Sequence, residues 1–351
     1  MDEMKKDQLI NTRIVRQYPL QSAEQLALDL PQTKKEKETV LAGRAAAENI
    51  LSGKDKRIFL IVGPCSLHDK ESAKEYADRL LILSEKVKDR MLIVMRCYFE
   101  KPRTVIGWKG LRTDPALDGS NNINLGLHIS REIVKYNASI GLYSGTEYLS
   151  TVTPQYFGDF ISWACIGART AESQEHRCMA SGLSVACGFK NGTSGDISVA
   201  INGVLTSRQP HTFEGVTASN SVAIFKTTGN PYSHIILRGG KKPNYSSRHV
   251  KLAQAELAKK GLAPNVVVDC SHGNSQKDPK KQKTVFLDVI GQILSGNKLI
   301  KGIMLESHLF EGNQPIKKKL RYGVSITDPC LGWEDTESLI LAGYEQLKRK
   351  G

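Results

Sequence analysis

The stretch IFLIVGPCSLHDKESAKEYADRLLILSEKVKDRMLIVMRCYFEKPR, residues 58–103, decides the fold. It begins with an apolar run at Ile58–Val62 and reaches a second run at Leu92–Cys97. Between the runs, apolar residues recur at helical spacing, and Asp69 stands where an N-cap is expected. A helix joining two fully apolar strands is typical of a parallel sheet, because the chain must cross over to run again in the same direction.

The same alternation continues to the end of the chain. Short apolar runs recur between helical stretches at Gly141–Tyr148, Ala164–Ala168, Val185–Phe189, His234–Leu237, Val266–Cys270 and Gly302–Leu305. With the first two runs, this makes eight strands separated by crossovers. Eight such units predict an α/β protein whose parallel sheet closes into a (β/α)8 TIM barrel.

Two segments depart from this alternation. Residues 1–55 are polar and are expected to form an N-terminal extension with one helix near Thr39–Leu51. Residues 211–227 alternate around a polar turn, which predicts an inserted β-hairpin. We therefore expect a barrel domain over residues 56–351 that carries the hairpin, while the extension serves oligomer contacts or regulation. Thr153-Pro154 is expected to begin a helix, with the threonine as its cap.

The composition narrows the class of protein. The formal net charge is +13, but no nucleic-acid-binding motif accompanies the basic residues, so we expect no nucleic-acid partner. No apolar run is long enough to cross a bilayer, and the N-terminus lacks a signal-peptide core, so we expect no membrane partner. The seven cysteines are widely spaced and odd in number, which is typical of free thiols in the cytoplasm.

Cationic side chains gather where the predicted strands end. The set comprises Arg96, Lys101, Arg103, Arg169, Lys190 and Arg238. In a barrel of this kind the C-terminal strand ends meet at one mouth. So many cations in one place would repel one another unless anions bind there, and arginine offers paired donors to phosphate or carboxylate. The pattern predicts two multiply charged anionic substrates.

A second set of strand-end residues is suited to a metal ion: Cys65, His272, Glu306 and Asp328. Thiolate, imidazole and carboxylate together suit Mn²⁺, Fe²⁺, Co²⁺ or Zn²⁺ better than Ca²⁺. The residues alone leave an alternative open. In that interpretation Cys65 is a small buried residue, His272 is a cap or core residue, and the two carboxylates pair with nearby cations.

Several long motifs carry a family resemblance: GPCS (63–66), RCYFEKPRTVIGWKG (96–110), IGARTAESQEHR (166–177), GFKNGTSG (188–195), LRGGKKPNY (237–245), DCSHGNSQK (269–277) and SITDPCLGWEDTE (325–337). From about residue 40 onward, the chain resembles the feedback-regulated 3-deoxy-D-arabino-heptulosonate 7-phosphate (DAHP) synthases of the shikimate pathway. The resemblance implies condensation of phosphoenolpyruvate with D-erythrose 4-phosphate by a metal-dependent transferase. It departs from the family at Ala171, Cys178, Ala186, Cys187 and Ser194, which flank the expected phosphate ligands.

The resemblance also implies residue roles. Cys65, His272, Glu306 and Asp328 would hold the metal. Arg169, Lys190 and Arg238 would bind the phosphate of phosphoenolpyruvate, with Arg96 and Lys101 near its carboxylate. Erythrose 4-phosphate would be held by Lys101, Pro102, Arg103, Thr104 and Asp328. The residues expected to act in catalysis are Lys101, Cys65, His272 and Glu147.

Regulation is implied as well. An aromatic amino acid would bind near Pro154, Gln155, Ser184, Phe213 and Gly215, with the N-terminal segment of a partner chain. Gly215 leaves room for a hydroxyl group, which favours tyrosine over tryptophan or phenylalanine. A homodimer or homotetramer is expected.

Three other interpretations remain at this stage. They are a synthase that condenses phosphoenolpyruvate with another sugar phosphate, a catalytically inactive regulatory relative, and a nucleic-acid-binding barrel. Cys330 adds a separate hypothesis: because it stands two residues from Asp328, it could form a disulfide with Cys65 when the metal is lost.

Overall fold

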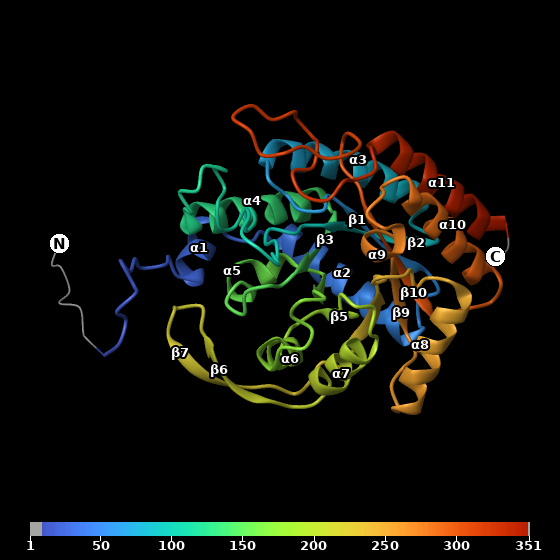
Figure 1. Ribbon diagram of the computed structural model, residues 1–351, viewed down its shortest axis with the longest axis horizontal. Helices are drawn as coiled ribbons and strands as arrows, with labels where there is room; N and C mark the ends of the chain where they lie inside the picture. The colour runs from blue at the N-terminus through green and yellow to red at the C-terminus, as the bar shows by residue number, and fades with distance from the viewer. Residues whose placement is uncertain (1–8, 350–351) are drawn as a thin grey trace.

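The computed structural model describes residues 9–349, in which eight parallel strands close into a barrel surrounded by helices (Figure 1). Around the barrel each strand pairs with the next in chain order, and the last pairs with the first. The strands are β1 (Ile58–Gly63), β2 (Met91–Arg96), β3 (Tyr143–Glu147), β4 (Trp163–Ile166), β5 (Ala186–Lys190), β8 (His234–Leu237), β9 (Val266–Asp269) and β10 (Ile300–Glu306). The predicted TIM barrel is confirmed.

Helices cover the outside of the barrel. They are α3 (Lys70–Val87), α4 (Ile123–Ile140), α6 (Gln174–Ser181), α7 (Ser198–Ser207), α8 (Ser247–Lys259), α10 (Lys281–Leu294) and α11 (Trp333–Arg349), with short turns α5 (Pro154–Phe157), η1 (Gly158–Phe160) and α9 (His272–Ser275). Asp69 accepts a hydrogen bond from the Ser72 N–H and so caps α3 as predicted. Among the described residues, no helix combines the length and apolar character needed to cross a membrane.

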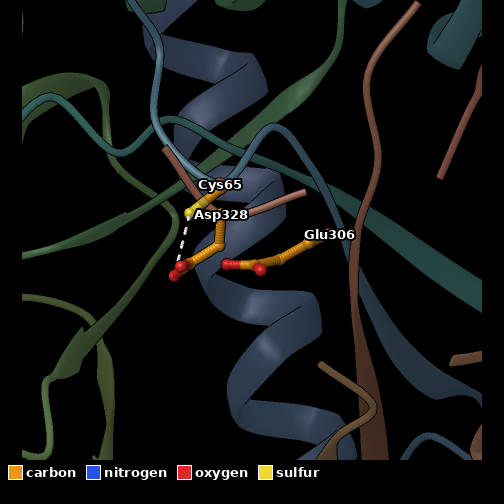
Figure 2. A group of neighbouring side chains, drawn as sticks. All are labelled: Cys65, Glu306 and Asp328. Atoms are coloured by element: carbon orange, nitrogen blue, oxygen red, sulfur yellow. Dashed lines mark hydrogen bonds between the residues drawn. The ribbon is translucent and has the colours of Figure 1, made fainter. Parts of the chain in front are cut away.

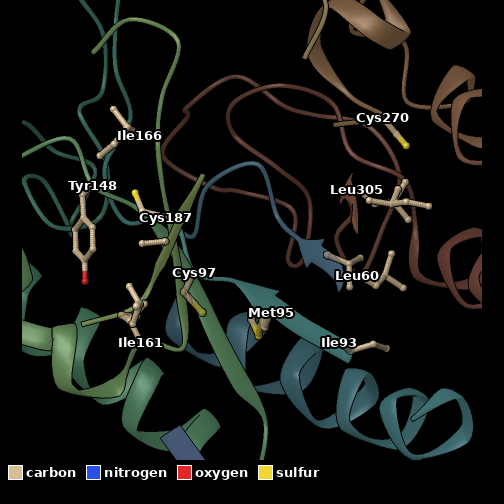
Figure 3. Close-up of a cluster of buried hydrophobic side chains, with 14 of the residues drawn as sticks. Leu60, Ile93, Met95, Cys97, Tyr148, Ile161, Ile166, Cys187, Cys270 and Leu305 are labelled. Atoms are coloured by element: carbon tan, nitrogen blue, oxygen red, sulfur yellow. The ribbon is translucent and has the colours of Figure 1, made fainter. Parts of the chain in front are cut away.

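A layer of buried apolar side chains fills the space between the barrel and these helices. Leu60, Ile93 and Leu305 point outward from neighbouring strands into this layer (Figure 3). Cys187 and Cys270 lie in the same layer, fully buried. Both thiols are therefore packing residues, as small buried cysteines usually are.

The N-terminal extension contains two helices, α1 (Ala23–Asp29) and α2 (Lys34–Ser52). Helix α2 begins five residues before the predicted start at Thr39, because Thr33 and Glu36 form a capping box that the sequence interpretation overlooked. Residues 1–8 of the predicted extension lie outside the described part of the chain.

Helix α2 closes the N-terminal end of the barrel. Its Ala47, Ile50 and Leu51 join the cluster of side chains that fills the barrel interior. A side chain at Gly43 would place Cβ only 2.5 Å from Ser162 Oγ, so the helix needs glycine where it crosses the strand ends. The interior is thus sealed at this end, and the opposite end is left for polar side chains.

The inserted hairpin is confirmed as β6 (Thr212–Val216) paired antiparallel with β7 (Val222–Lys226). It curves along one side of the barrel, and its turn reaches the segment around α1 (Figure 1). The Glu24 N–H donates to Ala218 O over 2.9 Å, and Asn220 Nδ2 donates to Leu20 O over 2.7 Å. Hairpin and extension are therefore joined within one chain.

Candidate active site

The C-terminal strand ends bring the predicted site residues to one mouth of the barrel. Arg96, Glu147, Lys190 and Glu306 are the last residues of their strands. Cys65, Lys101, Arg169 and Arg238 follow their strands within a few residues, and His272 begins the short helix α9 just after β9. Asp328 lies farther along, in the long segment between β10 and α11. This is the face at which (β/α)8 enzymes carry their active sites.

Three of the four predicted metal ligands form a cluster. Candidate ligand atoms of Cys65, Glu306 and Asp328 all lie within 4.8 Å of one another, and the three side chains point toward a common centre (Figure 2). His272 borders the cluster, with Nε2 3.6 Å from Glu306 Oε1. One sulfur, one imidazole nitrogen and two carboxylates form a donor set that suits a divalent transition metal. The residues present therefore fit such an ion.

Lys101 contacts two members of the cluster. Its Nζ lies 2.7 Å from Cys65 Sγ and 3.4 Å from Asp328 Oδ2. Burial raises the pKa of the Cys65 thiol to about 11, because the Glu306 charge adds to the burial effect and Lys101 only partly opposes it. Burial also opposes ionisation of Asp328, yet Lys101, His272 and Lys277 together hold its pKa below the usual value.

Arg96 lies almost completely buried beneath the cluster. Its Nη2 is 3.0 Å from Glu306 Oε1, and the guanidinium lies 4.0 Å from the centroid of the Tyr98 ring. Its Nη1 is buried and has no hydrogen-bond partner among the described residues. A buried donor without a partner is costly, and an anionic ligand would satisfy it.

Lys190 and Glu147 form a buried ion pair at the mouth of the barrel, with Nζ 3.3 Å from Oε2. Burial opposes both charges. For Lys190 the carboxylates of Glu147 and Asp269 outweigh that effect and raise the pKa, and for Glu147 the cations Lys190, Lys101 and Arg96 lower it. Both side chains are therefore charged at neutral pH.

The loop after β2 approaches Arg169 from across the mouth. Arg169 is exposed, and its Nε donates to Thr104 Oγ1 over 3.1 Å. Arg103 instead turns back on its own loop and donates to Trp108 O over 2.8 Å, while the Trp108 indole donates to Asp114 O. Pro102 is half-buried beside Lys101. The structure thus brings Thr104 to a predicted phosphate ligand and leaves Arg103 facing its own loop.

Three buried asparagines hold the cationic strand ends in place. Asn191 Oδ1 accepts the Arg238 N–H over 2.8 Å and the Asn244 amide over 3.1 Å. Asn274 accepts from the Asn244 N–H and donates to backbone oxygens at the ends of β8 and β9. The sequence interpretation did not include them. Asn191 directly follows the strand-end charge Lys190, which was a usable signal, whereas Asn244 and Asn274 stand several residues beyond their strands.

Glu100 joins two loops of the mouth. Its Oε2 accepts from the N–H groups of Leu149 and Ser150 and from Thr153 Oγ1, and its Oε1 pairs with Arg112 at 2.8 Å. The predicted helix start is confirmed, with Thr153 at the N-cap position and Pro154 as the first residue of α5. The threonine makes no side-chain cap, because its hydroxyl donates to Glu100.

A separate hollow of about 350 Å³ contains three of the five predicted effector residues. Pro154, Gln155 and Ser184 line it together with Arg44 and Tyr148. The other two, Phe213 and Gly215, lie on β6 and do not line the hollow. Phe213 stacks instead on Phe225 of β7, with ring centroids 5.8 Å apart.

Comparisons with known proteins agree with this geometry. Residues 29–340 match the model of the DAHP synthetase I family. The chain is 46 % identical to the Tyr-sensitive phospho-2-dehydro-3-deoxyheptonate aldolase of Salmonella typhimurium, over 98 % of each chain. It is 52 % identical to the Phe-sensitive enzyme of Escherichia coli K12, over 88 % of this chain and 89 % of that one.

A solved structure shows the same fold. The phospho-2-dehydro-3-deoxyheptonate aldolase of Francisella tularensis superimposes with a TM-score of 0.94 at 46 % identity, covering 96 % of this chain and 99 % of that one. Fold, motifs and near-complete coverage agree, and we conclude that the chain belongs to the DAHP synthetase I family.

Proposed function

We propose that this protein condenses phosphoenolpyruvate with D-erythrose 4-phosphate and water to give DAHP and phosphate. It would act as a transferase at the first step of the shikimate pathway. The observation that carries the proposal is the cluster at the barrel mouth, where Cys65, Glu306 and Asp328 converge around Lys101. Relatives aligned over nearly the whole chain bear the name of this activity.

The cations at the mouth divide into two groups in this proposal. Lys190 and Arg238, with Arg169, would hold the phosphate of phosphoenolpyruvate, and the free Nη1 of Arg96 would meet its carboxylate beside Lys101. Arg103 and Thr104, on the loop with Pro102, would hold the phosphate of erythrose 4-phosphate, with Lys101 and Asp328 near its aldehyde. Arg103 must leave Trp108 O to do so.

When held by Cys65, His272, Glu306 and Asp328, a divalent ion such as Mn²⁺, Fe²⁺, Co²⁺ or Zn²⁺ would act as a Lewis acid on the aldehyde. Carbon 3 of phosphoenolpyruvate then forms the new bond to the aldehyde carbon, and Lys101 Nζ stabilises and protonates the resulting alkoxide. Water adds to carbon 2, and phosphate leaves by cleavage of its C–O bond toward Lys190 and Arg238. Glu147, held by Lys190, lies near the reacting carbons.

We further propose that an aromatic amino acid binds the hollow beside Pro154, Gln155 and Ser184. Its volume is within the range of small-molecule sites. Tyrosine remains the favoured effector, ahead of tryptophan and phenylalanine. The basis is Gly215, which leaves room for a hydroxyl group, although this glycine lies on β6 and not in the lining of the hollow.

A homodimer or homotetramer is part of the same proposal. The N-terminal segment exposes Leu9, Val15 and Tyr18, and the hairpin exposes Val222 and Ile224. Apolar side chains gathered on two joined segments are typical of a protein interface. We place the enzyme in the cytoplasm, where a reducing environment keeps the Cys65 thiol available as a ligand.

The test is an assay of phosphoenolpyruvate consumption with erythrose 4-phosphate, before and after EDTA treatment and after Mn²⁺ is restored. Activity that disappears with EDTA and returns with Mn²⁺ supports both the reaction and the metal. Separate wells with tyrosine, phenylalanine or tryptophan identify the effector. Absence of activity with every metal would overturn the proposal. Turnover with another aldose phosphate in place of erythrose 4-phosphate would instead support the rival synthase.

A further inference from the structure

Asp269 ends β9 with a fully buried side chain that the reaction described above does not use. Its Oδ2 lies 2.9 Å from His272 Nδ1 and 3.6 Å from Lys190 Nζ. We propose that Asp269 is a positioning residue, which orients His272 toward the metal and Lys190 toward phosphoenolpyruvate at the same time. The Lys190 half of this inference rests on the proposed function, and the His272 half does not.

The contacts around His272 fix which ring nitrogen carries the proton. Ser271 donates its hydroxyl hydrogen to Asp269 Oδ1 over 2.6 Å, and the Ser271 N–H donates to the same oxygen over 2.9 Å. The Ser271 oxygen, 2.7 Å from His272 Nδ1, can then only accept a hydrogen bond from the ring. Asp269 Oδ2 makes no hydrogen bond among the described residues, but its negative charge lies 2.9 Å from Nδ1 and also favours hydrogen on that nitrogen.

The hydrogen on Nδ1 leaves the opposite ring nitrogen, Nε2, free to bind a metal. With hydrogen on Nδ1, Nε2 keeps its lone pair, and Nε2 is the nitrogen that faces Glu306 Oε1 at 3.6 Å. A histidine that binds a metal commonly donates its other N–H to a carboxylate, which fixes both tautomer and ring orientation. Here Ser271 accepts the Nδ1–H, and Asp269 holds Ser271 in place through its Oδ1, so the ring is oriented before any ion arrives.

The backbone at His272 shows that the position needs such support. Its φ is +55°, in the left-handed region that non-glycine residues rarely adopt. Two further hydrogen bonds hold the turn: Asn274 Nδ2 donates to Asp269 O over 2.8 Å, and the Lys277 N–H donates to His272 O over 2.8 Å. A residue kept in a strained conformation by its neighbours is typical of a functional site.

On the other side, Asp269 shares Lys190 with Glu147. The Lys190 ammonium lies 3.3 Å from Glu147 Oε2 and 3.6 Å from Asp269 Oδ2, so it is held between two carboxylates. Without the Asp269 charge, only Glu147 would attract the lysine, and the ammonium would shift toward β3. One substitution at Asp269 should therefore disturb both metal binding and phosphoenolpyruvate binding.

The experiment compares Asp269→Asn with Ser271→Ala in the full-length protein. Mn²⁺ affinity of the EDTA-stripped protein is measured from the EPR signal of free Mn²⁺, without substrates, and KM for phosphoenolpyruvate is measured at saturating Mn²⁺. We expect D269N to weaken Mn²⁺ binding about 10–100-fold and to raise KM. We expect S271A to weaken Mn²⁺ binding by a smaller factor and to leave KM unchanged, because the side chain of Ser271 hydrogen-bonds Asp269 and His272 and leaves the Asp269–Lys190 pair in place.

Thermal unfolding of the metal-free variants controls for a merely structural role. A lower Tm with unchanged Mn²⁺ affinity in D269N would overturn the inference. If D269N does not fold, the S271A variant tests the orientation of His272. An S271A protein that binds Mn²⁺ as tightly as the wild type would overturn the proposal that Asp269 and Ser271 orient His272. Mn²⁺ binding is measured without substrates. If the wild type proves inactive in the assay but D269N still binds Mn²⁺ more weakly than the wild type, only the proposed function is overturned.

Discussion

His234 on β8 is a buried histidine inside the barrel with defined roles for both ring nitrogens. Trp163 Nε1 is 3.3 Å from His234 Nε2 and can only donate, so Nε2 accepts and Nδ1 donates to Tyr232 O over 3.0 Å. Burial lowers the pKa of His234 to about 4, and the hydrogen bond to Tyr232 offsets this only in part. The folded state therefore keeps the ring neutral.

This lowered pKa predicts loss of stability in weak acid. Above pH ~6.5 the ring is neutral in both states, and its contribution is fully present. As the pH falls from ~6.5 toward ~4, only the unfolded chain binds the proton, so unfolding becomes easier by about 1.4 kcal/mol per pH unit. In His234→Gln, the free energy of unfolding, measured with urea, should fall less steeply with decreasing pH across this range, by about 1.4 kcal/mol per pH unit. Equal slopes in both proteins would contradict the prediction.

Cys65 and Cys330 allow a second prediction at this scale. The Cys65 N–H donates to Cys330 Sγ over 3.4 Å, so the two residues are neighbours beside the cluster. After metal removal, a mild thiol oxidant should join them and lower the mass by about 2 Da. Bound Mn²⁺ should prevent this by occupying Cys65. Cys330→Ala should retain Mn²⁺ binding and resist the cross-link, and an unchanged mass in the oxidised wild-type apo protein would end the hypothesis.

Among the elements, the connection through Glu100 carries the clearest consequence. Glu100 directly precedes the loop from Lys101 to Thr104 and hydrogen-bonds the segment that leads to Pro154 of the proposed effector hollow. Burial raises its pKa, although Arg112 and the backbone donors oppose that shift. The loop that would bind erythrose 4-phosphate and the loop that borders the hollow therefore share one buried side chain.

Glu100→Gln should loosen this connection, because the amide lacks the charge that faces Arg112 and has one acceptor oxygen fewer. We expect KM for erythrose 4-phosphate to rise about tenfold, equivalent to about 1.4 kcal/mol, with a smaller change for phosphoenolpyruvate. We also expect weaker inhibition by the effector. The measurement is steady-state kinetics with and without the amino acid, and Lys109→Gln, on the same loop but exposed, serves as the control. Equal KM changes for both substrates would contradict the prediction.

The elements also show what a sequence pattern can resolve. The strands were located within one or two residues at most ends, because most of them are apolar runs that are buried on both faces. Strand β3 is the exception, since its sequence YSGTE is mainly polar although it is largely buried. The start of α2 was missed because its signal is a capping pair, Thr33 and Glu36, rather than an apolar period. The roles of Asp269 and Asn191 could not be predicted from the sequence, since they depend on contacts made across the closed barrel.

At the scale of the whole molecule, the order of strands predicted that the side chains after the strand ends would meet at one mouth, and the family resemblance added their roles. Cys65 and Asp328 are far apart in the chain, and only barrel closure brings their side chains to 3.7 Å. Only three of the five expected effector residues line the hollow beside Pro154, because Phe213 and Gly215 lie on the inserted hairpin, outside the barrel strands.

The exposed hairpin leads to a prediction about assembly. Val222 and Ile224 are 78 % and 73 % exposed, on the strand face opposite the half-buried residues of β7. Replacing both with aspartate should shift the protein to smaller oligomers in light scattering coupled to size exclusion, because charge in an apolar interface is costly. Leu252→Asp on α8, at an exposed apolar position far along the chain, should leave the mass unchanged. If the hairpin variant keeps the oligomer mass of the wild type, the prediction is wrong and the hairpin does not form the subunit interface.

Arg103 and Trp108 fold the loop after β2 back on itself, and Trp108 allows this loop to be followed by tryptophan fluorescence. The protein has three tryptophans, of which Trp163 lies in the barrel interior and Trp333 on α11, so Trp108 alone reports on the loop. Its indole is 8 % exposed and hydrogen-bonded to Asp114 O. Because indole emission moves to longer wavelength in water, a protein in which the other two tryptophans are phenylalanine would carry its own fluorescent label for each encounter with a sugar phosphate.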